Sequence, residues 1–388
     1  MLNIQYAKVK IIFFNRFLEE DRPFITKNWR FFYIVPAVLV HLISLTTHMG
    51  VLISKKQVIN VAHMLPPFLV SIHATLKALV LIPKTAEIST IMKDLGALWR
   101  TNYTDKQTKE KNRLLKRLNF CNKANFWVAM VGTAQYLISP MLEILIRRFI
   151  LQQPCELLLP VPASHPFDLN HNWFVYTAVY FFQSYTMFLL VYVYNGSELI
   201  LITICGLLAN EFVMLKDDLS RTTPTPNTIN ENGIGIEEFI KKHQKLIRLS
   251  RQLDNVFNRM IFVELLFVGI TSCAFRFAGE FARGLIYTLS NYVAVTISLV
   301  TVFYVCYYGE LLTSASVHLG NVAYKNLWYE GSKEYKQAIR LIIKRSQTPC
   351  GLTSLKYAAV SLNTFTKVVS TTWSYFSLMN SVYTVAEQ

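Results

Sequence analysis

Hydrophobic positions along the chain gather into seven long runs, and polar connections separate them. Each run holds about 20 predominantly apolar residues, the length of helix that crosses the hydrocarbon core of a bilayer. Prolines inside several runs, such as Pro36 and Pro140, are tolerated in membrane helices. The pattern predicts an all-α membrane protein with spans roughly at residues 31–54, 59–83, 125–147, 173–195, 260–278, 285–309 and 360–384.

The polar connections are not uniformly loop-like. Residues 103–126 and 236–260 combine charges with apolar residues at helical spacing, which predicts helices that extend the spans they precede. Residues 221–238 are rich in Pro, Asn and Thr and predict a flexible loop. We therefore expect residues 1–388 to form a single seven-helix membrane domain, with residues 213–259 and 313–356 as a helical region outside the bilayer.

Composition agrees with a membrane protein. Hydrophobic residues make up 52% of the 388 residues and charged residues only 16%, whereas soluble domains usually carry about a quarter charged residues. The net charge of +15 does not form one basic arm or patch, so no nucleic-acid partner is expected. This composition excludes a chain of soluble domains and indicates a protein embedded in the lipid bilayer.

Charge also predicts an orientation. Of the 39 Lys and Arg residues, 31 lie in alternate connections, at residues 1–30, 83–124, 213–259 and 313–356. Cytoplasmic loops carry the excess of basic residues, so these four segments are predicted to be cytoplasmic. Seven spans then place the N-terminus in the cytoplasm and the C-terminus outside the cell. This is opposite to the orientation of a G-protein-coupled receptor.

The sequence offers little catalytic or metal chemistry. The spacing of His165, Asp168 and His171 would suit a metal, but a tight Pro-Phe-Asp turn accounts for that segment, so no metal is expected. Six cysteines show no paired spacing; Cys155, in an outer loop, either stays single or bonds to Cys273. No nucleophile, base and orienting group cluster together. We predict neither an enzyme nor a cofactor.

Acidic residues within the spans are few. Glu143, Glu198 and Glu264 do not group in the sequence, so we expect no acidic cluster inside the membrane. A transporter would need such a cluster for its substrate or coupling ion. The sequence therefore gives a transporter no support.

The last run carries a polar stripe. Ser370, Ser374, Ser377 and Ser381 are spaced by four, three and four residues, so they share one face of a helix. Unpaired hydroxyls are unfavourable in lipid and turn towards protein or water. Two interpretations remain open from the residues alone: close helix packing, or a wall of a water-filled path.

Ordered motifs along the chain resemble those of the insect odorant receptor family. The outer loop reads Leu-Pro-Val-Pro from Leu159 and leads to Pro-Phe-Asp at Asp168. The C-terminal part carries Tyr-Gly-Glu-Leu-Leu, a serine, Asn-Leu-Trp-Tyr, Gln-Thr-Pro and Ser-Tyr-Phe, at Tyr308–Leu312, Ser314 or Ser316, Asn326–Tyr329, Gln347–Pro349 and Ser374–Phe376. No single motif is specific, but their order, the length and the topology together are.

The resemblance implies a subunit of a tetrameric, odorant-gated channel that conducts monovalent and divalent cations. It would lie in the plasma membrane of olfactory sensory neurons and form a heterotetramer with the odorant coreceptor. The cytoplasmic helical region of residues 213–259 and 313–356 would hold the subunits together. The chain lacks the long coreceptor insertion between the fourth and fifth spans, and Ser381 stands where the coreceptor has Gln. Both departures favour a tuning subunit. The alternatives are a gustatory-type channel without coreceptor and a G-protein-signalling receptor.

The resemblance also implies site residues. The last span would line the pore, with Ser374, Ser377 and Ser381 towards the ions and Leu378 as hydrophobic gate. A volatile small molecule would bind in the outer half of the bundle, between the second, third, fourth and sixth spans. Ordinary bundle packing is the alternative for each candidate ligand contact: Met64, Phe68, Tyr136, Met141, Tyr176, Tyr180, Gln183, Met187 and Tyr287. The identity of the odorant is not encoded in any motif.

Overall fold

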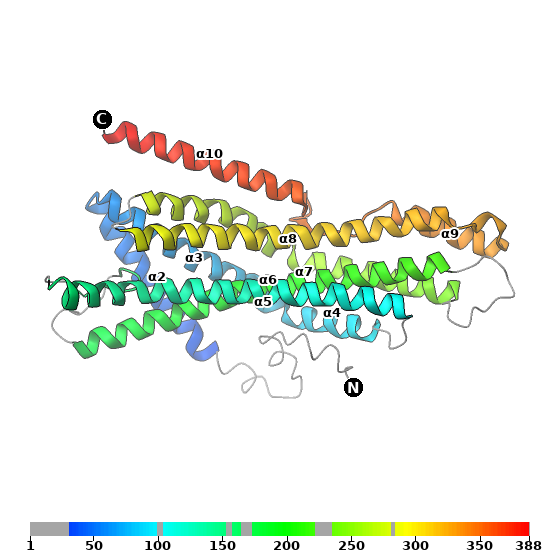
Figure 1. The fold of residues 1–388 in the computed structure, drawn as a ribbon, viewed down its shortest axis with the longest axis horizontal. Coiled ribbons are helices and arrows are strands. Elements are labelled where there is room, and N and C mark those ends of the chain that lie inside the picture. Colours follow the sequence, from blue (N-terminus) through cyan, green and yellow to red (C-terminus); the bar gives the residue numbers. More distant parts are fainter. Residues whose placement is uncertain are drawn as a thin grey trace.

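The structure, a computed structural model, describes residues 31–98, 104–152, 157–163, 173–221, 235–280 and 284–387. Long helices run along the longest axis of an elongated bundle (Figure 1). The helices are α2 Phe31–Ser54, α3 Val58–Leu81, α4 Thr85–Leu98, α5 Asp105–Leu145, α6 Trp173–Arg221, α7 Ile236–Glu280, α8 Leu285–Lys325, α9 Lys333–Ser346 and α10 Leu362–Glu387. Short turns of 3₁₀ helix lie at Ile82–Lys84 and Trp328–Glu330, and a π-helical turn at Ile146–Ile150.

The predicted helices are present, and the all-α prediction is confirmed apart from one small hairpin. Among the described residues, six segments are long and apolar enough to cross a membrane, and they contain α2, α3, α5, α6, α7 and α8. The seventh predicted span coincides with α10. Serines and threonines lower the hydropathy of α10, so length and composition alone do not select it.

Helix α6 is the centre of the bundle. It is 49 residues long, about 74 Å at 1.5 Å per residue, and no proline interrupts it. From Asn195 to Cys205 every residue is buried, because α3, α5, α7 and α8 surround the helix. A helix that is buried on all sides is expected to be apolar all round, and α6 largely is. Its few buried polar residues therefore call for an explanation.

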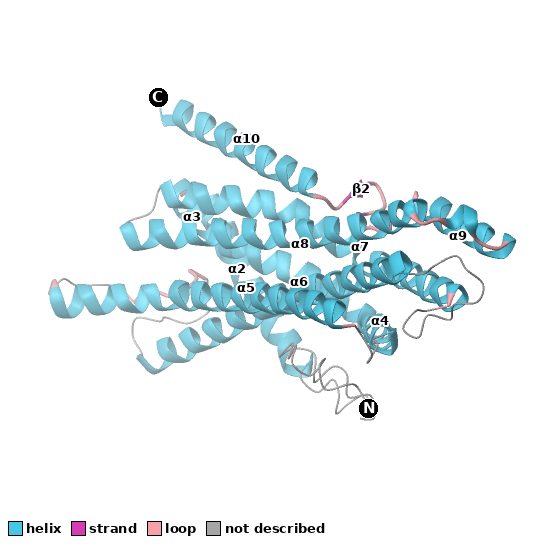
Figure 2. Ribbon diagram, turned by 45° about the vertical axis from the view of Figure 1, so that its right-hand side comes forward, coloured by secondary structure: helices cyan, strands magenta, loops and turns pink. Residues whose placement is uncertain are grey.

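Helix α10 differs from the rest because it contacts the bundle on one side only. It leans against α7 and α8 and diverges from them in two views (Figures 1 and 2). An antiparallel hairpin, β1 Thr353–Ser354 with β2 Ala358–Ala359, precedes it. Asp254 of α7 accepts hydrogen bonds from Thr353 N at 2.7 Å and Thr353 Oγ1 at 2.8 Å, which docks the hairpin on α7.

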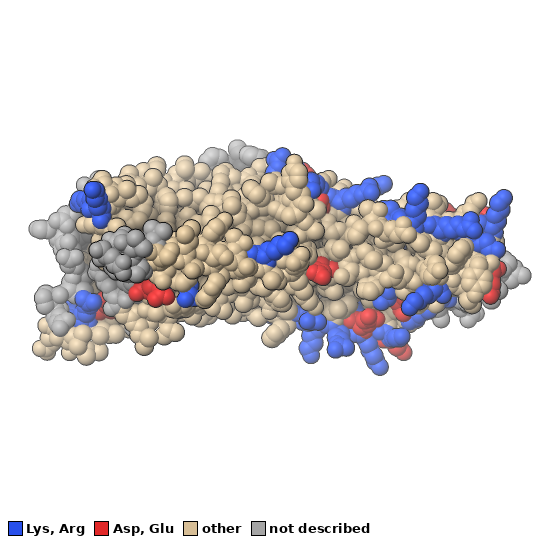
Figure 3. Space-filling view, turned by 90° about the horizontal axis from the view of Figure 1, so that it is seen from above, with Lys and Arg blue, Asp and Glu red and all other residues tan. Residues whose placement is uncertain are grey.

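Charged side chains are distributed unevenly along the molecule. In the view from above, most Lys and Arg lie on the half that carries α9, a few lie at the opposite end, and the stretch between is mostly uncharged (Figure 3). This is the surface that a multi-pass membrane protein requires.

Several sequence predictions fall outside the described residues. These are the partner cysteine Cys155, the metal-like spacing of His165, Asp168 and His171, and most of the loop at residues 221–238. Cys273 is described, and its thiol donates a hydrogen bond to the Thr372 carbonyl at 3.1 Å.

Candidate functional site

A cavity of about 130 Å³ lies between five helices of the bundle. Its walls are mainly aliphatic and aromatic. They come from α3 (Pro67, Val70, His73), α5 (Ala129, Gly132, Thr133, Tyr136, Leu137), α6 (Met187, Val191, Tyr194, Asn195), α7 (Thr271, Phe275) and α8 (Ser290, Val293, Ala294, Ile297, Ser298). These include the second, third, fourth and sixth predicted spans, joined by the fifth. An apolar cavity of roughly 150 Å³ holds a benzene molecule, so this one suits a compact organic ligand.

Two of the predicted ligand contacts line this cavity. Tyr136 of α5 and Met187 of α6 both face it, and Met187 is buried. The two helices bring them together although they lie about 50 residues apart in the sequence. Their contact with a ligand stays a prediction.

Three residues of α6 that were predicted to contact the ligand instead form hydrogen bonds with backbone atoms. Tyr176 donates a hydrogen bond to the Leu158 carbonyl at 2.7 Å, and Tyr180 donates one to the Leu137 carbonyl. The Gln183 side-chain oxygen accepts a hydrogen bond from Val161 N at 3.3 Å. These side chains fix the segment 157–163 and α5 against α6. They shape the end of the bundle where α6 begins and do not line the cavity.

The remaining predicted contacts lie around the cavity and not on its walls. Met64 is fully buried in an outer apolar cluster with Leu45, Leu137 and Met187, and Phe68 packs against that cluster. Met141 is 51% exposed on the outside of α5. Tyr287, in the first turn of α8, faces the Glu143 carboxylate.

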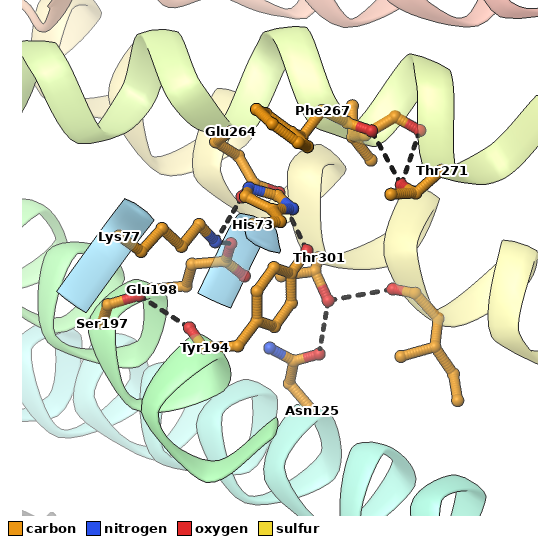
Figure 4. Close-up of polar contacts among 12 residues, drawn as sticks. His73, Lys77, Asn125, Tyr194, Ser197, Glu198, Glu264, Phe267, Thr271 and Thr301 are labelled. Carbon is orange, nitrogen blue, oxygen red and sulfur yellow. Dashed lines mark hydrogen bonds and ion pairs between the residues drawn. The ribbon is translucent and has the colours of Figure 1, made fainter. Parts of the chain in front are cut away.

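A buried ionic cluster borders the cavity, and its side chains are drawn in Figure 4. The ammonium group of Lys77 on α3 pairs with the carboxylates of Glu198 on α6 and Glu264 on α7. All three side chains are fully buried. His73, one turn before Lys77, lies with its Nε2 3.2 Å from Glu264 Oε2. Tyr194 donates a hydrogen bond to Glu264 Oε1 at 3.2 Å, and its ring lies 3.6 Å from the Lys77 nitrogen.

The cluster is part of the cavity wall because His73 and Tyr194 belong to both. His73 is held on its other side by Phe267, which stacks on its ring at 4.9 Å. Two carboxylates and one ammonium carry a net charge of −1 when His73 is neutral. Neutrality therefore requires one more proton, on His73 or on a carboxylate. Glu198 and Glu264 also lie within hydrogen-bonding reach of each other, so a proton shared between the two carboxylates would meet this requirement.

This cluster corrects the expectation that the acidic residues of the predicted spans do not come together. Glu198 and Glu264 are 66 positions apart in the sequence, yet both reach Lys77. Glu143 does not join them; it pairs with Arg147 one turn away at 2.6 Å. Separation along the chain carries no information about distance between packed helices. The available signal was Lys77 with His73 at the i−4 position of an otherwise apolar span, since an ionisable residue there marks a functional or structural site.

The serine stripe of α10 faces away from the bundle. Ser374, Ser377, Leu378 and Ser381 are all exposed, with Leu378 at 61%. On a helical wheel the buried Phe376 lies about 160° from Leu378, so the stripe and the packed face are opposite. The stripe therefore does not serve helix packing within this chain. Ser374 and Ser381 donate to their own helix, to Ser370 O at 3.1 Å and Leu378 O at 2.8 Å.

The start of α10 is fixed by the Tyr-Gly-Glu motif of α8. Glu310 Oε2 accepts a hydrogen bond from Leu362 N at 2.8 Å and so satisfies a free backbone donor of the first turn. A Cβ added at Gly309 would lie 3.1 Å from the Val360 carbonyl oxygen, so glycine permits the close approach before α10. This motif positions the base of the last helix.

The outer half of α10 is held by α7. The Arg276 guanidinium lies 4.0 Å from the centre of the Phe376 ring and 4.9 Å from that of Trp373. A Cβ added at Gly269 would lie 3.3 Å from Thr372 Oγ1, which again indicates close approach. Leu378 is two residues beyond Phe376. A cation–π contact thus holds the helix to α7 close to the position that the sequence predicts as a gate.

Comparisons with known proteins agree with this architecture. Odorant receptor 67c of Drosophila melanogaster is 26% identical over 219 residues, which is 56% of this chain and 54% of that relative. The chain thus spans about half the length of this curated relative. The odorant receptor coreceptor of Ooceraea biroi is 23% identical over 145 residues, or 37% of this chain and 30% of that protein. Both similarities are partial.

The fold has a solved counterpart. The structure of the insect olfactory receptor OR5 from Machilis hrabei in complex with eugenol superimposes with a TM-score of 0.79 and 12% identity over 98% of each chain. At this identity the likeness shows a shared fold. The model of the 7tm odorant receptor family matches residues 57–373. Because that match covers most of the sequence, the chain belongs to the 7tm odorant receptor family.

Proposed function

We propose that the protein is a tuning subunit of an odorant-gated cation channel that works together with a coreceptor. The observation that carries the proposal is the apolar cavity between α3, α5, α6, α7 and α8 in a chain of this family. Its fold is shared with an olfactory receptor whose solved structure contains eugenol, a small organic molecule. The match to odorant receptor 67c is longer and closer than the match to the coreceptor, which favours the tuning role.

Co-expression tests this function. Cells that express the chain with an insect odorant coreceptor should give odour-evoked cation current across a panel of volatile molecules. The chain alone should give little or none, because the proposed pore includes coreceptor subunits. Robust current from the chain alone would instead identify a gustatory-type channel, and silence with the coreceptor across the panel would contradict the proposal.

The proposed pore is formed by α10 of four subunits around one axis. The exposed stripe Ser374, Ser377 and Ser381 supports this arrangement, since it is polar, opposite the packed face and uncovered within the chain. In a tetramer the stripe would face water, which hydrates hydroxyl groups and ions. Leu378, beside the stripe, would form the hydrophobic constriction that closes the pore by excluding water.

The proposed orientation places the α9 end in the cytoplasm and the C-terminus outside. The supporting observation is that most Lys and Arg lie on the half that carries α9 (Figure 3). An epitope tag after Gln388 should be stained on intact cells of the plasma membrane, and a tag before Met1 only after permeabilisation. The reverse staining pattern would favour a G-protein-signalling receptor. The native site we propose is the membrane of olfactory sensory neurons.

Met187→Ala should change which odorants activate the channel. Met187 lines the cavity and is 5% exposed, so truncation enlarges the cavity towards larger ligands. The ratio of the sensitivities to a larger and a smaller agonist should change roughly tenfold. A change of about 1.4 kcal/mol in the difference between their binding free energies gives this factor. The measurement is a set of dose–response curves with the coreceptor.

Met260→Ala is the matched control for this change. Met260 on α7 is fully buried in the main core and does not line the cavity. Both truncations remove the same buried volume, and each costs about 2–5 kcal/mol of stability. Met260→Ala should lower the amount of channel at the surface without altering relative sensitivities. If the wild type, Met187→Ala and Met260→Ala have the same relative sensitivities to larger and smaller agonists, the ligand binds outside this cavity.

A further inference from the structure

One buried polar group at the cavity remains unused by the protein. Asn195 lines the cavity from α6 and is 2% exposed, and its side-chain oxygen has no hydrogen-bond partner among the described residues. A buried amide without a partner is unfavourable, and such groups are rare in folded proteins. Its position at a cavity wall indicates that the missing partner is a ligand.

Several other polar side chains of the cavity already bond to the protein. The hydroxyl groups of Thr133, Thr271 and Ser298 donate to carbonyls of their own helices, each at 2.8 Å. His73 is occupied by Glu264 in the ionic cluster. Asn195 differs from them because its buried side-chain oxygen has no hydrogen-bond partner among the described residues. Around it the cavity offers mainly apolar contact, from residues such as Val191 and Phe275.

We propose that Asn195 anchors the ligand by a hydrogen bond and makes the protein selective for compact hydroxyl compounds, a phenol or a small alcohol. This inference rests on the proposed function and names its ligand class. An amide oxygen accepts, so the ligand must donate, which a ketone or an ether does not do. The cavity volume limits the rest of the ligand to about one ring.

The test compares hydroxyl probes with apolar probes of matched shape. Cells co-expressing the full chain and the coreceptor are exposed to phenol and toluene, and to cyclohexanol and methylcyclohexane. The wild-type protein should be roughly tenfold more sensitive to each hydroxyl compound than to its partner, as expected for one hydrogen bond in a buried site. Asn195→Leu, which has nearly the same shape, should abolish this preference and keep the response to toluene.

Thr133→Val is the control variant, since it removes a cavity hydroxyl that is already bonded to Ala129 O. It should keep the tenfold preference. If Asn195→Leu impairs assembly, Asn195→Ala tests the same point, and it should respond with equal sensitivity to the hydroxyl and the apolar probe of each pair.

The inference is overturned if the wild-type protein responds equally to both members of each pair, or if Asn195→Leu or Asn195→Ala keeps the preference for the hydroxyl probe. It is also overturned if only odorants larger than these probes evoke current. In each case the odorant-evoked current persists and the proposed function stands. Absence of current with every odorant would overturn the proposed function, and this inference with it.

Discussion

Replacing Lys77 by methionine is expected to remove most of the folded protein from the cell surface. Methionine matches the length of lysine, but it leaves Glu198 and Glu264 without their shared cation in a fully buried position. Removing one partner of a buried ion pair costs about 3–5 kcal/mol, a large part of the stability of an average domain. Surface biotinylation in cells and the melting temperature of purified protein in detergent measure the loss.

Lys84→Met is the matched control. Lys84 pairs with Glu87 at 2.7 Å, but both side chains are substantially exposed, at 37% and 51%. Exposed pairs contribute about 0–1 kcal/mol, so surface expression should be nearly that of wild type. Equal loss in both variants would show that the buried cluster has no special role in stability.

Neutral variants of the carboxylates sharpen the interpretation. Glu198→Gln should be tolerated far better than Lys77→Met, because Lys77 keeps Glu264 as counter-ion and the cluster becomes neutral. The combination of Lys77→Met with Glu198→Gln and Glu264→Gln should recover much of the lost surface expression, because no charge then remains unpaired. No recovery would indicate that the specific contacts, and not the charge balance, are needed.

Replacing Leu378 by serine is expected to raise the resting current several-fold when the chain is expressed with the coreceptor. A hydrophobic ring closes a narrow pore by excluding water, and a hydroxyl group removes that barrier. The side chain is 61% exposed within one chain, so the substitution removes little packing. Whole-cell current without odorant, normalised to surface protein, is the measurement.

Leu289→Ser on α8 is the control for this second change. Leu289 is 52% exposed, similar to Leu378, but it lies outside α10 and away from the serine stripe. Its resting current should match wild type. An unchanged resting current in Leu378→Ser would favour the alternative left open by the sequence, that the serine stripe serves close helix packing.

The sequence predicts the helices well because each span needs a continuous apolar run, and such a run is visible without knowledge of its neighbours. The predicted face of α6 illustrates the limit. Tyr176, Tyr180, Gln183 and Met187 share that face as their spacing requires, but only Met187 reaches the cavity. The polar tips of the other three meet backbone carbonyl or amide groups of other segments. Spacing gives the direction of a side chain, whereas the partner depends on packing.

The ionic cluster was missed for a related reason. Its members come from three helices, and each is a single charge in an apolar run. Asn195 is equally inconspicuous in the sequence. A search that treats every ionisable or amide residue in a predicted span as unexplained would have selected Lys77, His73, Glu198 and Asn195 before the structure was known. The pairing among them would still have required the fold.

The length of helix α6 connects the cavity with the far end of the bundle. Met187 at the cavity and Leu219, whose carbonyl accepts a hydrogen bond from Asn326 at 3.1 Å, lie on the same unbroken helix. At 1.5 Å per residue they are about 48 Å apart. A stiff rod of that length turns a tilt of only about 3° into a displacement of roughly 2.5 Å at its far end. A small tilt of α6 about its cavity end would therefore appear as a movement of ångström size where α8 ends and the Asn-Leu-Trp-Tyr turn begins.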